Sequence, residues 1–146
     1  MTLEFTQSAA LTMGVELELA LPEDLVDSRI GNSLEFYFDS SYTKFGYAWI
    51  FPKKEGISVG LIDQIQTANK ANRLLRFSKN HPIASQKLKG SKEKVMGGTS
   101  LHAALLPNGL AQKTYGERFL LVGDAAGFAD PITWEGSYFA LRISGF

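Results

Sequence analysis

The sequence predicts an α+β fold that is mostly antiparallel sheet, with one long helix and a C-terminal strand–turn–helix element. Three observations favour this class. Short alternating apolar runs, separated by turn residues, recur up to Ile62, as in antiparallel strands. Residues 63–80 follow a helical rhythm instead. Near the C-terminus, an apolar run at 119–122 leads into small residues and then into a helical stretch from Ser137 to Ile143.

The first expected strand is the run 15–21, in which apolar residues alternate with polar ones. Because successive side chains of a strand point to opposite faces, Glu16 and Glu18 are expected on a solvent-facing side. A second, aromatic-rich strand is expected at 34–38. Residues 22–28 between these strands are expected to form a polar connection or a short helical turn.

Residues 47–52 and 57–62 are expected to form a hairpin that is closed by a turn ending in glycine. The two-residue period of a strand places Tyr47, Trp49 and Phe51 on one face. Three aligned aromatic rings form a flat apolar wall that suits a long hydrocarbon. The alternative is an ordinary core strand, in which such rings pack only against the protein itself.

Residues 63–80 are predicted to form the long helix, with Asp63 as its N-cap. The pair His81-Pro82 is expected to end it, because a residue before proline avoids the helical region. Its charges are expected to be solvated, and an anion-binding site is the less favoured alternative. The predicted core-facing stripe is Ile65, Ala68, Asn72 and Leu75, and the predicted basic face is Lys70, Arg73, Arg76 and Lys79.

The composition excludes several classes of function. The chain has 146 residues, 15 basic and 15 acidic side chains and no cysteine. Disulfides, thiol catalysis and cysteine-ligated metals are therefore excluded, and a cytoplasmic location is expected. The balanced charge gives no indication of nucleic acid or of an anionic membrane surface as partner. The two histidines lack the spacing of metal ligands, so no metal is expected.

The stretch from Phe119 to Gly136 carries the strongest motif. Residues 119–122 are expected to form a short buried strand, after which Gly123 and Asp124 place a carboxylate at the strand's end. Ligands of α/β sheets bind at this edge, and the small residues that follow allow close approach of a bulky ligand. The start of the next helix offers free N–H groups to an anion or a polarised carbonyl.

The run from Leu121 to Gly136 reads Leu-Val-Gly-Asp-Ala-Ala-Gly-Phe-Ala-Asp-Pro-Ile-Thr-x-Glu-Gly. It resembles the second flavin motif of para-hydroxybenzoate-hydroxylase-like oxidoreductases, and within them most closely the geranylgeranyl reductase family. The resemblance implies FAD as cofactor, with Asp124 bonded to its ribityl chain. It also implies a glycine where this chain has Trp134. The cofactor-binding residues that it implies are Gly123, Asp124, Ala125, Ala126, Gly127, Pro131, Thr133, Glu135 and Gly136.

A second motif, Tyr-x-Trp-x-Phe-Pro-Lys at 47–53, is also typical of this family, where it lies in the substrate-binding sheet beside the flavin. The resemblance implies a substrate-binding type of sheet and helix at 1–112 and the second half of an FAD-binding domain at 113–146. No Gly-x-Gly-x-x-Gly unit occurs, so we expect the N-terminal FAD-binding half to be missing and the chain alone to be inactive. The implied substrate-binding residues are Tyr47, Trp49, Phe51, Pro52 and Lys53.

The resemblance implies an FAD-dependent enzyme that reduces carbon–carbon double bonds of isoprenoids, with peripheral membrane association through its lipid substrate. The substrate would be an isoprenoid or another apolar small molecule. No side chain is assigned as catalytic, because hydride chemistry belongs to the cofactor. Two alternatives stay open: a flavin monooxygenase-like or halogenase-like enzyme of the same fold, and a non-catalytic lipid-binding remnant.

Overall fold

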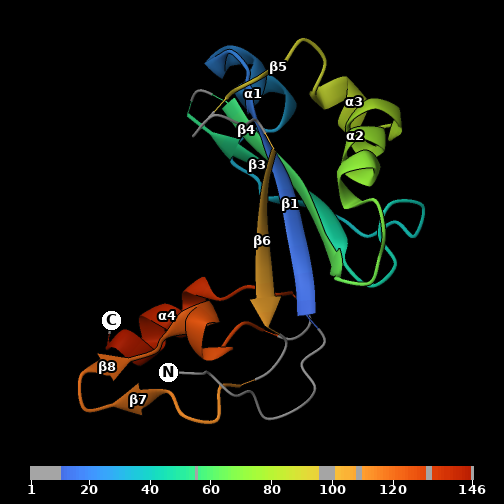
Figure 1. Ribbon diagram of the computed structural model, residues 1–146. Coiled ribbons are helices and arrows are strands. Elements are labelled where there is room, and N and C mark those ends of the chain that lie inside the picture. The colour runs from blue at the N-terminus through green and yellow to red at the C-terminus, as the bar shows by residue number, and fades with distance from the viewer. Residues whose placement is uncertain (1–10, 55, 96–100, 108–109, 131–132, 146) are drawn as a thin grey trace. The chain divides into compact units, whose positions relative to one another are not determined.

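A computed structural model describes residues 11–54, 56–95, 101–107, 110–130 and 133–145 (Figure 1). The chain forms two compact units, one comprising residues 13–104 and the other residues 1–12 with 105–146. The described residues form an α+β chain with a mostly antiparallel sheet, as the sequence predicts. None of the described helices has the length and apolarity needed to cross a bilayer.

The larger unit is organised around a twisted sheet. Its strands lie in the order β2-β3-β4-β1-β5, and β6 also pairs with β1. The pairs β2–β3, β3–β4 and β1–β5 are antiparallel. The strands are β1 (Leu11–Ala20), β2 (Glu35–Tyr37), β3 (Tyr47–Lys53), β4 (Gly56–Gln64), β5 (Lys92–Glu93) and β6 (Leu101–Pro107).

In the hairpin of β3 and β4, Tyr47, Trp49 and Phe51 share one face of the sheet, as predicted. Trp49 lies opposite Gly60, and Phe51 lies opposite Ser58. Pro52 pairs with Ile57 of β4, at a position where β2 no longer accompanies β3. Since proline has no N–H to donate, the end of the β2 pairing is a place where it costs no ladder bond.

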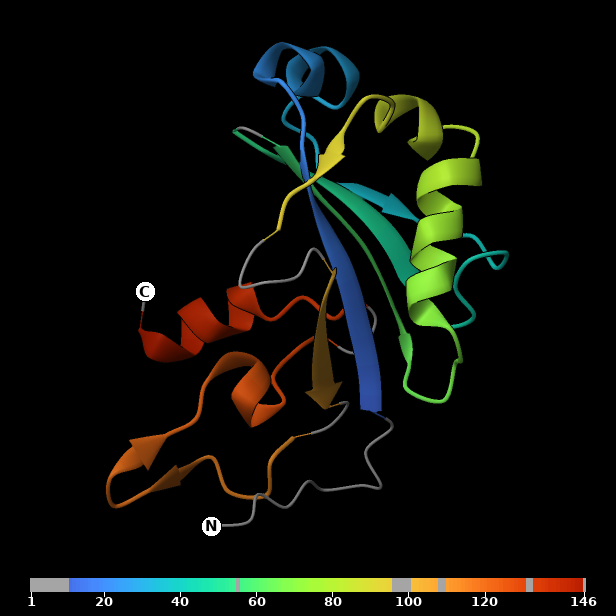
Figure 2. The same cartoon turned by 45° about the horizontal axis from the view of Figure 1, so that its top comes forward.

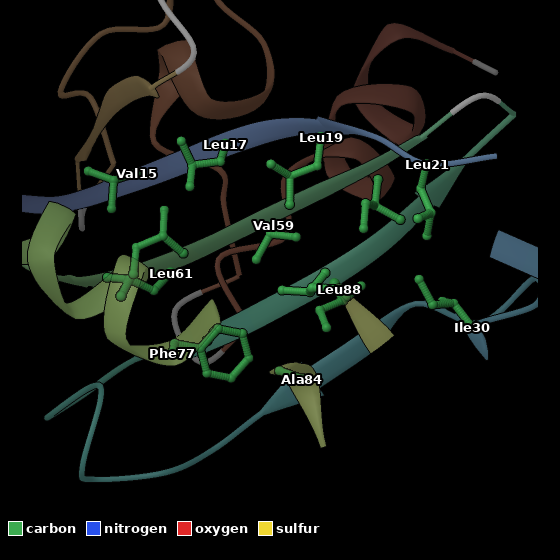
Figure 3. Packing of buried hydrophobic residues seen from close by; sticks show 14 of the residues in the cluster. Val15, Leu17, Leu19, Leu21, Ile30, Val59, Leu61, Phe77, Ala84 and Leu88 are labelled. Carbon is green, nitrogen blue, oxygen red and sulfur yellow. The ribbon is translucent and has the colours of Figure 1, made fainter. Parts of the chain in front are cut away.

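One face of the sheet packs against helices and forms the hydrophobic core. Figure 2 shows α2 lying along this face, and Figure 3 shows apolar side chains of β1 and β4 directed toward Phe77 of α2. Ile50 of β3 and Val59 of β4 are completely buried here. The helices of this unit are α1 (Glu23–Arg29), α2 (Lys70–Asn80) and the short α3 (Ala84–Lys87).

The long helix begins later than the sequence predicts, and it turns a different stripe to the core. β4 continues to Gln64, because pairing with β3 holds Ile62 and its neighbours in the sheet, so Asp63 is a buried strand residue and not an N-cap. α2 begins at Lys70 and ends before His81 and Pro82, as expected. Its buried residues are Lys70, Leu74 and Phe77, whereas Asn72 and Leu75 are exposed.

Two charged residues that were expected in solvent are buried. Lys70 is 6% exposed, and its Nζ donates hydrogen bonds to the carbonyls of Ile65 and Thr67. Burial lowers the pKa of Lys70, because the charged form loses its hydration. Glu18 is also 6% exposed and forms an ion pair with Lys53. Each charge is thus buried only together with partners that replace water.

The smaller unit contains β7 (Tyr115–Gly116), β8 (Phe119–Leu120), a 3₁₀ turn η1 (Gly123–Ala126) and α4 (Ser137–Ser144). The prediction of a buried strand at 119–122 is wrong. Only Phe119 and Leu120 are in a strand, and Leu120 is 64% exposed. Among the described residues β8 pairs only with β7, and a two-stranded ribbon has no further strand or helix to bury both of its faces.

Candidate functional site

The face of the sheet opposite α2 carries a cluster of aromatic rings from β3 and β2. Tyr47, Trp49 and Phe51 share this face, as the alternation predicts, and Phe36 of β2 lies among them. The ring of Phe36 is 5.2 Å from those of both Tyr47 and Phe51, in edge-on geometry. Trp49 and Phe51 stack at 5.8 Å with 25° between their planes. We call these four residues the aromatic face.

The indole of Trp49 is held in place by the backbone of Gly60 and by a hydrogen bond to Ser58. A Cβ on Gly60 would lie 2.1 Å from Cζ2 of Trp49, so only glycine lets the indole lie flat on β4. The indole Nε1 donates to Oγ of Ser58 at 3.2 Å, and that hydroxyl donates to Glu16 at 2.9 Å. Buried polar atoms arranged in such a chain hold one rotamer, because each alternative leaves a donor unsatisfied.

Sequence reasoning placed only part of this face. It missed Phe36, Ser58 and Glu16, although Phe36 sits in the expected strand 34–38 and the alternation could have found it. The remaining two residues of the 47–53 motif behave differently. Pro52 turns to the opposite face, where it lines a pocket beside α1. Lys53 is exposed, and its ammonium group is engaged by Glu18.

In the smaller unit, the turn after β8 displays Asp124 to solvent. Gly123 has φ +57° and Gly127 has φ +74°, so both occupy the left-handed region that glycine tolerates best. Backbone bonds from Gly127 to the Asp124 carbonyl and from Phe128 to the Gly123 carbonyl, both 3.0 Å, close the turn. Within the described part of the chain, the Asp124 carboxylate accepts no hydrogen bond. It is therefore free to accept one from a ligand hydroxyl.

The carboxylate of Asp124 lies directly against Gly136, at the start of α4. A Cβ on Gly136 would be 1.9 Å from Oδ1 of Asp124, and a Cβ on Gly123 would meet Ala140 at 3.0 Å. The two glycines of the motif are thus what lets the turn and the helix touch. The structure brings three of the residues that the resemblance assigns to the cofactor, Gly123, Asp124 and Gly136, close together.

The first turn of α4 is already capped by Glu135. Its carboxylate accepts hydrogen bonds from the backbone N–H groups of Ser137, at 2.6 Å, and Tyr138, at 3.2 Å. Those groups were expected to face a ligand. A bound carbonyl or anion must share them with Glu135 or displace it, since a helix start has few free donors.

The loop before Glu135 is closed by Asp130. Its carboxylate accepts from both the N–H, at 2.7 Å, and the hydroxyl, at 2.9 Å, of Thr133, while its carbonyl accepts from the N–H of Trp134. Trp134 has φ +53°, so the backbone here keeps a left-handed conformation that normally selects glycine. Of the other predicted cofactor residues, Ala125 is exposed, Ala126 is buried, and Pro131 lies outside the described residues.

The chain is similar to part of several curated proteins. A digeranylgeranylglycerophospholipid reductase from Methanocaldococcus jannaschii is 37% identical over 112 residues, which cover 75% of this chain and 27% of the relative. A protein of the same name from Methanococcus aeolicus is 38% identical, with the same 75% and 27% covered. The chain thus spans about a quarter of the length of these relatives. No protein-family model matches it.

Solved structures share the fold. A geranylgeranyl bacteriochlorophyll reductase-like protein from Thermoplasma acidophilum has a TM-score of 0.69 and 24% identity, over 91% of this chain and 31% of that one. The flavin-dependent brominase Bmp2 has a TM-score of 0.62 and 16% identity, over 97% and 34%. At such identities the likeness concerns architecture alone.

Proposed function

We propose that this chain, which is 37% and 38% identical to two digeranylgeranylglycerophospholipid reductases over 75% of its length, belongs to the geranylgeranyl reductase family and is a segment of a flavin-dependent oxidoreductase that reduces carbon–carbon double bonds in isoprenoid chains. The observation that carries the proposal is the aromatic face, whose rings are held in place by Gly60 and by the Glu16–Ser58–Trp49 chain. A flat, rigid apolar surface matches a polyprenyl chain, which has no polar group to satisfy.

The cofactor in this proposal is FAD, and the Asp124 carboxylate accepts a hydrogen bond from its ribityl chain. The exposed carboxylate and the glycine that lies against it support the assignment. Residues 113–146 supply this half of the cofactor site and residues 1–112 the substrate surface. A further N-terminal half, with the dinucleotide fingerprint, completes the enzyme, so the chain alone retains no flavin.

The protein's part in the reaction is to position the substrate and to exclude water. When bound, a reduced flavin would supply a hydride to one alkene carbon, and solvent would supply the proton for the neighbouring carbon. Tyr47, Trp49 and Phe51 hold the isoprenoid against the sheet by apolar contact. Because the aromatic rings pack on one another, the isoprenoid binds to a surface that is already ordered. Binding therefore costs little conformational entropy of the protein. Location in the cytoplasm and peripheral association with membranes through the lipid belong to the same proposal.

Flavin retention tests the cofactor assignment. The chain is coexpressed with the N-terminal region of the Methanocaldococcus jannaschii reductase, and flavin absorbance is measured after dialysis. We expect bound flavin in the unmodified pair and a loss of about tenfold or more in affinity for Asp124→Ala, the order expected for a hydrogen bond to a charged group. Asp24→Ala, an exposed carboxylate on α1, is the matched control. Equal flavin content in both variants would contradict the role of Asp124.

Product analysis tests the reaction. The reduced complex is incubated with a geranylgeranyl lipid under argon, and the masses of the products are measured by mass spectrometry. We expect each reacted double bond to gain two hydrogens. Turnover of NAD(P)H that needs oxygen and inserts it into an aromatic substrate would instead identify the monooxygenase alternative.

A further inference from the structure

The larger unit contains a basic pocket on the helix side of the sheet, away from the aromatic face. It has a volume of about 470 Å³ and is lined by residues of the loop between β2 and β3 and of the N-terminal end of α2. Figure 1 shows these two segments near each other. Three of the lining side chains are cationic and none is acidic. The lining residues are Lys44, Gln66, Thr67, Ala68, Asn69, Asn72, Arg73 and Arg76.

Asp63 holds the loop and the helix of this pocket together without neutralising the pocket's positive charge. Its fully buried carboxylate accepts hydrogen bonds from the backbone N–H groups of Lys44, at 2.8 Å, and Phe45, at 3.3 Å. Arg73 lies 3.6 Å from the same carboxylate and donates to the carbonyl of Tyr42 at 3.2 Å. One buried acid thus ties the loop to the helix, and its charge is balanced by Arg73.

Two cations of the pocket are left over. Among the described residues, neither Lys44 nor Arg76 forms an ion pair, and both side chains are exposed. The carboxamides of Asn69 and Asn72 add further donors to the same wall. A pocket with surplus positive charge, amide donors and no carboxylate favours an anion with several oxygens, and a phosphate group has that chemistry.

The surroundings indicate where this phosphate comes from. Phe45, directly after Lys44, is 65% exposed, and Phe38 at the other end of the loop is 73% exposed. An exposed aromatic ring next to a cation is the composition with which peripheral proteins meet anionic membranes.

We propose that the pocket formed by Lys44, Arg73 and Arg76 binds the phosphate of an anionic phospholipid headgroup, with Phe45 entering the lipid interface. This goes beyond the proposed reductase, which it draws on only for the expectation that a lipid is near. Neither flavin nor reduction is needed for the binding, so the two proposals fail independently.

The test is cosedimentation of the 146-residue chain with vesicles. We expect binding to phosphatidylcholine vesicles that contain phosphatidylglycerol and little binding to pure phosphatidylcholine. Lys44→Gln combined with Arg76→Gln should lower the affinity about twenty-five-fold, since each basic residue near an anionic surface contributes about fivefold. Arg73 is left intact because it pairs with buried Asp63. Circular dichroism confirms that the variants are folded.

The matched control removes two exposed lysines of the same unit that do not line the pocket, Lys54→Gln with Lys79→Gln. An equal loss in this control would show unspecific attraction and overturn the proposal, and so would equal binding to neutral vesicles. Phe45→Ser should weaken binding without changing charge. Binding of inorganic phosphate in the absence of any vesicle binding would assign the pocket to a soluble phosphate and overturn the lipid assignment.

Discussion

The two sequence motifs of this chain are built in opposite ways. The aromatic face of β3 is a set of side chains locked by one another, with Trp49 held over Gly60 and bonded through Ser58 to Glu16. The turn from Gly123 to Gly136 is held by backbone bonds and leaves the Asp124 carboxylate exposed.

The difference separates stability from ligand binding. Substitutions in the aromatic face disturb packed, rigid neighbours, so they should lower the free energy of unfolding. A substitution at Gly136 meets the exposed carboxylate of Asp124, so it should hardly change stability while it changes what the turn can bind.

The largest effect is expected for Gly60→Ala. Its methyl group would lie 2.1 Å from the Trp49 ring, which cannot move without breaking its stack on Phe51. We expect a loss of about 2–3 kcal/mol in the free energy of unfolding, measured by urea titration. Gly14→Ala is the control, because there the methyl group would stand 3.9 Å from the same ring. Equal losses at both glycines would show that the indole is not fixed.

A smaller effect is expected for Ser58→Ala, which removes the acceptor of the Trp49 Nε1 bond and the donor to Glu16. A buried donor without a partner costs about 1–2 kcal/mol, so the urea midpoint should fall accordingly. Ser33→Ala, an exposed serine before β2, should leave the midpoint unchanged. If Ser58→Ala is also neutral, the polar chain adds nothing to the aromatic face.

In the turn, Gly136→Ala should lower the free energy of unfolding by less than about 0.5 kcal/mol. The added methyl group meets the side chain of Asp124, with Oδ1 at 1.9 Å and Cγ at 3.0 Å, and this exposed side chain can rotate into solvent; the φ of −113° at Gly136 suits alanine. Flavin retention by the coexpressed complex should nevertheless fall, because the carboxylate has moved. In an Asp124→Ala background the same substitution should have no further effect, which a double-mutant cycle measures.

The smallest effect concerns the pH dependence set by Lys70. Burial holds its pKa in the folded state below the ordinary value of 10.5. The unfolded chain therefore binds the proton more tightly, so the free energy of unfolding should rise as the pH increases through the alkaline range up to that value. Lys70→Met should flatten this rise in urea titrations at a series of pH values. An unchanged slope would contradict the depressed pKa.

The alternation of apolar residues was sufficient to predict β1, β3 and β4 and the shared face of Tyr47, Trp49 and Phe51, because strand periodicity is local. It failed at Asp63, where pairing across the sheet extended β4 and shifted the helix start, and at residues 119–122, where, among the described residues, β8 pairs only with β7 and is not buried between further elements. The approach of the Asp124 carboxylate to Gly136 and the capping of α4 by Glu135 were not predicted from the motif.

By itself, the sequence determined where strands form, which residues share a face, and the family to which the motifs belong, since all of these depend on residues close together in the chain. The tertiary structure alone decided which distant groups meet. It set Gly60 beneath Trp49 and buried Lys70. It also gathered Lys44 with Arg73 and Arg76 in a chain whose net charge is zero. The physical reason is that a side chain's environment depends on long-range pairing and packing, which no local pattern records.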